Sequence, residues 1–329
     1  MQITSLRKFQ NSAPSEAAPQ KLTNLESEPM EPVVAGDTII FASGTTQPLV
    51  RELYSVGTDG SGLEQLTNRE INLSWQPAAS PDGKKIAYVV EKEGRSDLQV
   101  MNLDGSGNVN LTDTNKGYWS PTWSPDGKTI VTTSRDTARG NLELVAVAAD
   151  GTSKTQLTNL GVNTDLPVFS PSGQHIVFSA APGFGPAVLC SIKADGSDFR
   201  AYSTDLMLVD EPVVTKDNRV IFSGTNGDGS YDIFEVGLDS DEPAKLLVDG
   251  EFALSPTLSP DGTKMAYVDY GSNVRFQVFE ASRDGSNPVQ VSSDSGYSTE
   301  PVYTPDGKSL VYLSSQEGDK EVYAKSLGE

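Results

Sequence analysis

The sequence contains very little cysteine and histidine. Cys190 is the only cysteine and His175 the only histidine among the 329 residues. No disulfide can therefore form within the chain, and a metal site that needs several cysteines or two histidines is excluded. The chain also lacks an apolar run of the roughly 20 residues that a membrane-spanning helix needs, so we expect no transmembrane segment.

Basic residues are scarce as well. The sequence has 25 lysines and arginines against 45 aspartates and glutamates, which gives a formal net charge of −20. Binding to the phosphate backbone of nucleic acids depends on lysine and arginine, so a nucleic-acid partner is not expected.

The first residues carry no signal for export. Arg7 and Lys8 are not followed by the apolar segment of a secretory signal, and the stretch QNSAPSEAAPQ from Gln10 is rich in Pro, Ala and Ser. We expect residues 1–20 to form a disordered linker and residues 21–329 one domain. The protein would be periplasmic or extracellular if a signal peptide or lipid anchor was removed, and cytoplasmic otherwise.

A repeat of about 45 residues runs through the chain. Its clearest copies are PTWSPDGKTIVTTS and PVYTPDGKSLVYLS. The copies begin near Pro32, Pro77, Pro121, Pro167, Pro212, Pro256 and Pro301, at intervals of 44 to 46 residues. Each copy contains four short β-like segments, with an S-P-D-G turn after the first and a D-G turn after the third. Four antiparallel strands per repeat predict an all-β, seven-bladed β-propeller, with six blades as the alternative.

The two ends of the sequence complement each other. The last repeat stops after its third strand, Glu321–Lys325, and therefore lacks an outer strand. The segment Lys21–Asn24 matches the outer strands of other repeats, although no repeat precedes it. We expect this N-terminal segment to complete the last blade and leave no open sheet edge. A ring closed in this way needs no second copy, so the sequence favours a monomer.

The repeat resembles the TolB-type propeller repeat, in which P-x-aromatic-S-P-D-G precedes an apolar strand; Pro121–Gly127 and Pro301–Gly307 are the nearest copies. Tricorn-type and prolyl-oligopeptidase-type proteins carry similar repeats. The resemblance implies a TolB-like protein with a role in envelope complexes or as a transport accessory. The chain departs from TolB in two ways: it has no room for the N-terminal α/β domain, and it has seven repeats where TolB has six.

Residues just before the repeat prolines are expected to surround the mouth of the central channel, on the face that carries the variable loops. They are Glu31, Gln76, Ser120, Leu166, Glu211, Ser255 and Glu300, and Asp165 and Asp210 stand one position earlier in their repeats. The carboxylates among them could bind a cation or the basic end of a peptide. The alternative is a solvated acidic rim on a protein that is acidic throughout.

Aromatic residues occur in the same connecting loops, namely Trp75, Tyr118, Trp119, Phe252 and Tyr297. Exposed aromatics are typical of protein interfaces and sugar sites, but these could also pack between blades. Phe184 and Arg135, in loops of the same face, complete the candidate binding residues. Trp123 differs, because every repeat has an apolar residue at its position, and we expect it to pack between blades.

One loop has oxygen-bearing side chains at alternating positions, as the start of a calcium loop does: Asn226, Asp228, Ser230 and Asp232. Tyr231 stands at the sixth position, where such a loop needs glycine, and Gly237 stands at the twelfth instead of glutamate. We therefore expect an ordinary loop and no cofactor, with calcium as the alternative.

No sequence motif indicates catalysis. The G-x-S-x-G motif of serine hydrolases is absent, and His175 is expected on the turn face, away from the channel mouth. The sequence favours a non-catalytic scaffold that binds a protein segment or peptide at the loop-rich face and channel mouth. Two alternatives are a propeller hydrolase or lyase that uses the mouth carboxylates with a divalent cation, and a carbohydrate-binding module.

Overall fold

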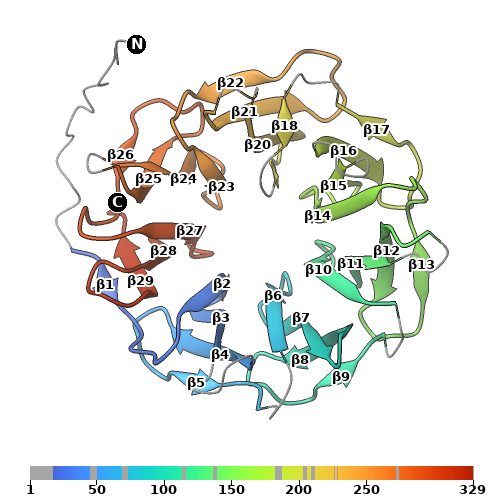
Figure 1. Cartoon of the computed structure of the whole chain (residues 1–329), viewed down its shortest axis with the longest axis horizontal. Helices are drawn as coiled ribbons and strands as arrows, with labels where there is room; N and C mark the ends of the chain where they lie inside the picture. Colours follow the sequence, from blue (N-terminus) through green and yellow to red (C-terminus); the bar gives the residue numbers. More distant parts are fainter. Residues whose placement is uncertain are drawn as a thin grey trace.

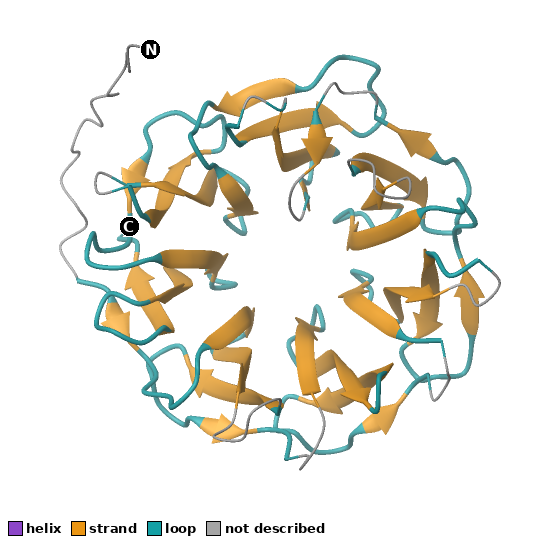
Figure 2. Cartoon of the chain, viewed as in Figure 1, coloured by secondary structure: helices purple, strands orange, loops and turns teal. Residues whose placement is uncertain are grey.

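Small antiparallel β-sheets surround a central axis in this chain (Figure 1). The computed structural model describes residues 18–44, 50–68, 73–112, 116–135, 139–181, 187–202, 206–208, 212–225, 227, 229–271 and 274–328. Within these ranges the regular elements are all strands (Figure 2). Accordingly, the described ranges contain no helix able to cross a membrane.

The strands form seven blades, numbered along the chain. Blade 1 has β2 (Pro29–Ala35), β3 (Thr38–Gly44), β4 (Arg51–Gly57) and β5 (Glu64–Gln65). Blade 2 has β6 (Leu73–Ala79), β7 (Lys85–Lys92), β8 (Arg95–Asn102) and β9 (Val109–Asn110). Blade 3 has β10 (Tyr118–Trp123), β11 (Thr129–Arg135), β12 (Leu142–Ala148) and β13 (Lys154–Gln156). Blade 4 has β14 (Asn163–Phe169), β15 (His175–Ala181), β16 (Val188–Lys193) and β17 (Arg200–Ala201).

Blade 5 has β18 (Met207–Leu208), β19 (Val213–Val214), β20 (Arg219–Thr225), β21 (Asp232–Gly237) and β22 (Lys245–Val248). Blade 6 has β23 (Leu254–Leu258), β24 (Lys264–Tyr270), β25 (Phe276–Ser282) and β26 (Val289–Gln290). Blade 7 has β27 (Ser298–Tyr303), β28 (Ser309–Ser314), β29 (Glu321–Ser326) and β1 (Gln20–Lys21). Blades 1 and 2 are joined into one sheet by a single parallel bridge between Arg51 and Leu73.

This architecture confirms the expected all-β propeller. The N-terminal strand β1 pairs antiparallel with β29, with Gln20 opposite Ala324, so it completes blade 7 (Figure 1). The division into a linker of residues 1–20 and a propeller of residues 21–329 stays a prediction, and residues 1–17 lie outside the described residues.

The two repeated turns are fixed by side chains of the turn itself. In blade 3, the Ser124 hydroxyl donates to Asp126 Oδ1 at 2.6 Å, and the N–H of Lys128 donates to the same oxygen at 3.0 Å. In the D-G-S turn of blade 2, Ser106 donates to Asp104 in the same way. These hydrogen bonds lower the pKa of both aspartates. The turn residues are therefore explained by folding.

The hydrophobic core lies between blades. The cluster around Ile130 of blade 3 also contains Ala87 and Leu98 of blade 2. Trp123 belongs to this cluster, and its indole N–H donates to the carbonyl of Ala78 in the preceding blade at 3.0 Å. The prediction that Trp123 packs between blades is confirmed. Cys190 is also buried, and desolvation raises the pKa of its thiol to about 12, so it stays protonated.

A hydroxyl–carboxylate pair fastens the outer strand to the third strand in several blades. In blade 3, Thr158 Oγ1 donates to Glu143 Oε2 at 2.6 Å and accepts the N–H of Leu144 at 2.8 Å. Thr67 with Glu52 and Thr112 with Asp97 repeat this arrangement in blades 1 and 2.

The same pair closes the ring. Thr23 Oγ1 donates to Glu321 Oε2 at 2.6 Å and accepts the N–H of Val322 at 3.0 Å. The second oxygen of Glu321 accepts the N–H of Leu25 at 2.9 Å. We call the contact between Thr23 and Glu321 the closure latch. It explains why a two-residue strand is sufficient to complete blade 7.

Replacing Thr23 by valine keeps the shape of the side chain and removes its hydroxyl. We expect the free energy of unfolding to fall by about 1 to 3 kcal/mol, because the buried Glu321 carboxylate loses a donor. Trypsin should also cut faster after Lys21, because β1 would separate from β29 more often. Urea unfolding and mass spectrometry of the tryptic fragments measure the two effects.

The matched control is Thr67→Val, which makes the same chemical change inside blade 1. This variant should lose stability without faster cleavage after Lys21. If both variants were cut equally fast after Lys21, Thr23 would not be the residue that holds the closure.

Candidate functional site

The residues before the blade prolines line the axis in an unusual conformation. Six of them are described and have a left-handed φ of 49° to 55°: Glu31, Gln76, Ser120, Leu166, Ser255 and Glu300. Each stands where the inner strand shifts register against its neighbour, as a β-bulge does. Left-handed non-glycine residues are uncommon, so the surrounding contacts must hold them there.

Hydrogen bonds join these residues from blade to blade. The N–H of Glu31 donates to Glu300 Oε2 at 2.7 Å, and the N–H of Gln76 donates to Glu31 Oε2 at 2.6 Å. The N–H of Ser120 then donates to Gln76 Oε1 at 2.8 Å. Each side chain thus accepts the backbone N–H of the following blade. We call this run of contacts, from Glu300 to Ser120, the axial chain.

In the axial chain, the carboxylates at the channel mouth have a structural role, because they accept backbone hydrogen bonds from the following blade. Burial raises the pKa of Glu31, and the charge of Glu300 acts in the same direction, while the N–H of Gln76 and the charge of Arg51 lower it. The net effect is a raised pKa. Asp165 accepts a hydrogen bond from Ser120 Oγ at 2.7 Å, and Lys320 Nζ lies 3.7 Å from Glu300 Oε1.

No group of three or more potential metal-ligating side chains occurs among the described residues. Glu211 and Asp210 lie outside the described residues, as do Phe184, Asn226 and Asp228. Asp232 Oδ1 accepts the N–H of Gly250 at 2.9 Å, which ties its loop to the next connection. The expectation of no cofactor, and the calcium alternative that includes Ser230, stay predictions.

The aromatic candidates near the axis differ in exposure. Tyr118 is buried in the core between blades 2 and 3, and Trp75 packs against the core between blades 1 and 2. Trp119 is half-buried and lies against Gly117, with the guanidinium of Arg135 5.8 Å from its ring centre. Tyr118 and Trp75 therefore serve packing, and Trp119 with Arg135 stays available on the loop-rich face.

A second group of aromatic residues gathers farther from the axis, over blades 5 and 6. The ring of Phe252 lies 5.1 Å from Tyr231, 4.7 Å from Tyr270 and 5.9 Å from Phe276. All four side chains are only half-buried. Sequence reasoning had singled out Phe252 alone, because the other three meet it only in the folded blade. We call these four residues and Tyr297 the aromatic surface.

A buried carboxylate positions the backbone under this surface. Asp269, 9% exposed, accepts the N–H of Phe252 at 2.9 Å and that of Tyr270 at 2.7 Å. Burial raises its pKa, and these N–H groups oppose the rise. The carbonyl of Tyr231 accepts the N–H of Ala253 at 2.8 Å. Three of the rings are thereby fixed through their main chains.

Tyr297 is the most exposed ring of the surface, at 55%. Its carbonyl accepts the N–H of Ser315 at 2.9 Å, and its N–H donates to Ser315 Oγ at 3.1 Å. The guanidinium of Arg275 lies 5.7 Å from the ring centre, a cation–π distance. Val274 beside it is 69% exposed and has a left-handed φ of 57°, which is rare for a β-branched residue. Exposed apolar groups and a cation are thus held on a constrained backbone.

Comparison with known proteins places the repeat in a family. The family model described as the TolB beta propeller domain matches residues 19–213, more than half of the chain. The chain belongs to this family. A TolB homologue from Chlorobium luteolum is 40% identical over 70 residues, a match that spans 21% of this chain and 15% of that protein. The activity and partners of the whole relative therefore do not transfer by this match.

Solved structures share the fold at low sequence identity. An oligogalacturonate lyase in complex with manganese has a TM-score of 0.72 at 14% identity, over 89% of this chain and 87% of the lyase. A prolyl endopeptidase has a TM-score of 0.70 at 16% identity, over 92% of this chain and 50% of the peptidase.

These structures correct the expectation of a non-catalytic scaffold at the channel mouth. That expectation took the absence of a catalytic motif as a sign of a binding protein, but the same propeller fold occurs in a lyase and in peptidases. The fold therefore gives no reason to class the chain with non-catalytic proteins.

The raised pKa of Glu31 predicts how stability depends on pH at the axis. The folded protein holds the proton of Glu31 more tightly than the unfolded chain does, so this group lowers stability as pH rises through its unfolded and then its folded pKa. Glu31→Gln keeps an oxygen for the N–H of Gln76 and removes the charge. We expect it to be more stable than wild type at pH 7 and equal to it at pH 3, measured by urea unfolding.

Glu31→Ala should instead lose about 1 to 3 kcal/mol at both pH values, because the N–H of Gln76 loses its acceptor. Glu28→Gln removes an exposed charge nearby and serves as the control for net charge. If Glu31→Gln were destabilised at pH 7 as strongly as Glu31→Ala, the carboxylate charge itself would be required and the assignment would be wrong.

Proposed function

We propose that the protein recognises a peptide segment on the aromatic surface of blades 5 to 7. The observation that carries this proposal is the exposed ring of Tyr297, held by its backbone and paired with Arg275. Tyrosine and arginine are enriched among the residues that dominate protein interfaces, where a few anchors supply most of the binding free energy.

The constrained backbone supports recognition. Tyr297 is bonded to Ser315 of blade 7, and Gln277 of blade 6 donates from Nε2 to the carbonyl of Gly296 at 2.6 Å. A backbone that is fixed from two blades loses little conformational entropy when a ligand binds to the side chain it carries. Variable loops on a rigid scaffold are also where binding residues are most often found.

The nature of the ligand agrees with the relatives. The prolyl endopeptidase acts, by its name, on peptides, and the part that this chain matches is half of that enzyme. The proposal concerns recognition only and assigns no reaction to the chain. It also assigns the protein, as a monomer, to the periplasm or the cell exterior, as the TolB-like repeat implies.

Selection of a random peptide library displayed on phage against the full chain tests the proposal. We expect selected peptides to bind Tyr297→Ala at least about ten-fold more weakly than wild type, as measured by fluorescence anisotropy. Arg275→Ala should weaken binding in the same direction. Thermal unfolding of each variant confirms that it is folded.

The matched control is Phe199→Ala, which removes another exposed aromatic ring, 49% exposed, from the turn after the third strand of blade 4. Affinity should not change in this variant. The proposal fails if selection enriches no peptide, if enriched peptides bind Tyr297→Ala as tightly as wild type, or if Phe199→Ala weakens them equally.

A further inference from the structure

The space between blades 5 and 6 contains a cavity of about 520 Å³ on the turn face, opposite the aromatic surface. Its charged lining consists of Asp217, Arg219, Glu235 and Lys245 of blade 5, and Arg283 and Asp284 of blade 6; Ser282 also lines it. The core between these two blades is apolar, as it is between other blades, and the charged pocket lies at its rim.

Two of these residues depart from the repeat. In each blade, the residue directly after the third strand donates its N–H to a carbonyl in the turn between the first and second strands. This residue is leucine or alanine in five blades (Leu103, Ala149, Ala194, Leu238 and Leu327), threonine in another (Thr58) and arginine in blade 6 (Arg283). The position of Glu235 is taken by Ser55, Val100, Ala146, Ser191 and Ala324 in five blades, and by Glu280 in blade 6. The rim of this space thus carries an arginine and a glutamate where most blades have small or apolar residues.

The two exceptional residues are paired across the blades. Arg283 Nη2 donates to Glu235 Oε1 at 2.9 Å, and Arg283 Nη1 lies 2.9 Å from Asp217 Oδ1. Arg219 Nε lies 2.6 Å from Glu235 Oε2, so the Glu235 carboxylate, whose side chain is 10% exposed, is shared by two guanidinium groups. Arg283 also keeps the pKa of Asp217 low. Both carboxylates are therefore paired with guanidinium groups.

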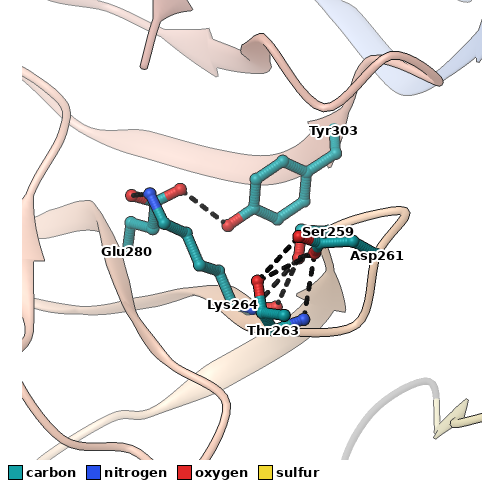
Figure 3. A network of polar contacts seen from close by, with 6 residues as sticks. All are labelled: Ser259, Asp261, Thr263, Lys264, Glu280 and Tyr303. Atoms are coloured by element: carbon teal, nitrogen blue, oxygen red, sulfur yellow. Dashed lines mark hydrogen bonds and ion pairs between the residues drawn. The ribbon is translucent and has the colours of Figure 1, made fainter. Parts of the chain in front are cut away.

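In the space between blades 6 and 7, a tyrosine is bonded to the glutamate at the equivalent position (Figure 3). Glu280 stands at the position of Glu235 and pairs with Lys264 at 2.9 Å. The hydroxyl of Tyr303 points at Glu280 and donates to its Oε1 at 3.0 Å, and the tyrosine is only 6% exposed (Figure 3). In blade 6, the residue at the position of Tyr303 is Leu258, which cannot donate a hydrogen bond to Glu235.

Two cations of the pocket keep hydrogen-bonding capacity. Within the described ranges, Lys245 makes no hydrogen bond or ion pair and acts on Asp284 only through its charge. Arg219 uses only Nε toward Glu235 in the same ranges, which leaves its two terminal nitrogens as donors. Of the hydroxyls at the wall, those of Thr263 and Ser286 already donate to Asp261 and Asp284, so Ser282 alone adds a neutral donor. An anionic group meets these requirements, because guanidinium and ammonium groups bind carboxylates and phosphates strongly.

We propose that this cavity binds a small molecule through a carboxylate or phosphate group, held by Arg219 and Lys245. Glu235 and Arg283 act as positioning residues that fix Arg219 and the cavity wall. The site is separate from the aromatic surface, so it does not depend on the proposed peptide recognition.

Isothermal titration of the full chain with inorganic phosphate, and separately with citrate, at low ionic strength tests the proposal. We expect saturable binding of at least one anion, weakened at least about ten-fold in Lys245→Gln, since a charge-assisted hydrogen bond is lost. Arg219→Gln should weaken binding similarly. Lys245 is exposed, so its variant is expected to fold even if Arg219→Gln does not.

Lys264→Gln is the control, because it removes the equivalent cation from the space that Tyr303 fills, and it should bind as wild type does. Preference for phosphate or for citrate identifies the anionic group, and either preference supports the site. The proposal is overturned if neither anion gives saturable heat, if Lys245→Gln binds as tightly as wild type, or if Lys264→Gln weakens binding as much as Lys245→Gln does.

Discussion

The closure latch between Thr23 and Glu321 is the contact on which the ring depends. Its partners are 298 residues apart, whereas the chemically similar pair of Thr158 and Glu143 spans only 15. The hydrogen bond at the closure therefore joins two segments from opposite ends of the chain, and contacts between residues so distant in sequence are costly to form. The hydrogen bond from Glu31 to Glu300 at the axis crosses the same junction, so inner and outer contacts of blades 7 and 1 form together.

Structural hydrogen bonds on the turn face and at the axis limit which side chains are available for binding. On the turn face, side chains such as Asp126 and Ser124 are committed to their own turns, and at the axis Glu31 and Gln76 are committed to the next blade. Both candidate binding regions occur in blades 5 to 7. They also lie beyond residue 213, where the match to the family model ends. Residues that the repeat does not require in these blades therefore carry the distinguishing chemistry.

The fold was predictable because the same turn residues and strand pattern recur several times along the sequence. Pro, Asp and Gly at the turns and the short Leu22-Thr23 segment were sufficient to predict the blades and their closure. The site was less accessible, because its contacts join residues that a single repeat does not relate. Nothing in the sequence shows that Glu31 accepts the N–H of Gln76, or that Tyr231, Tyr270 and Phe276 meet Phe252. Position-by-position comparison of repeats could have found Arg283, an arginine where five other blades have leucine or alanine.

That substitution is hard to explain by stability. Buried ion pairs lose hydration that their attraction only partly returns, and apolar replacements of similar volume are often neutral or stabilising. Other blades contain two alternatives: leucine or alanine at the position of Arg283, and a hydrogen bond from Tyr303 to Glu280 in the adjacent space. Since the fold accommodates either one, it does not require two arginines around Glu235 beside a cavity. A ligand for the guanidinium groups would explain the arrangement, since donors held in fixed positions bind an anion more strongly than donors that move freely.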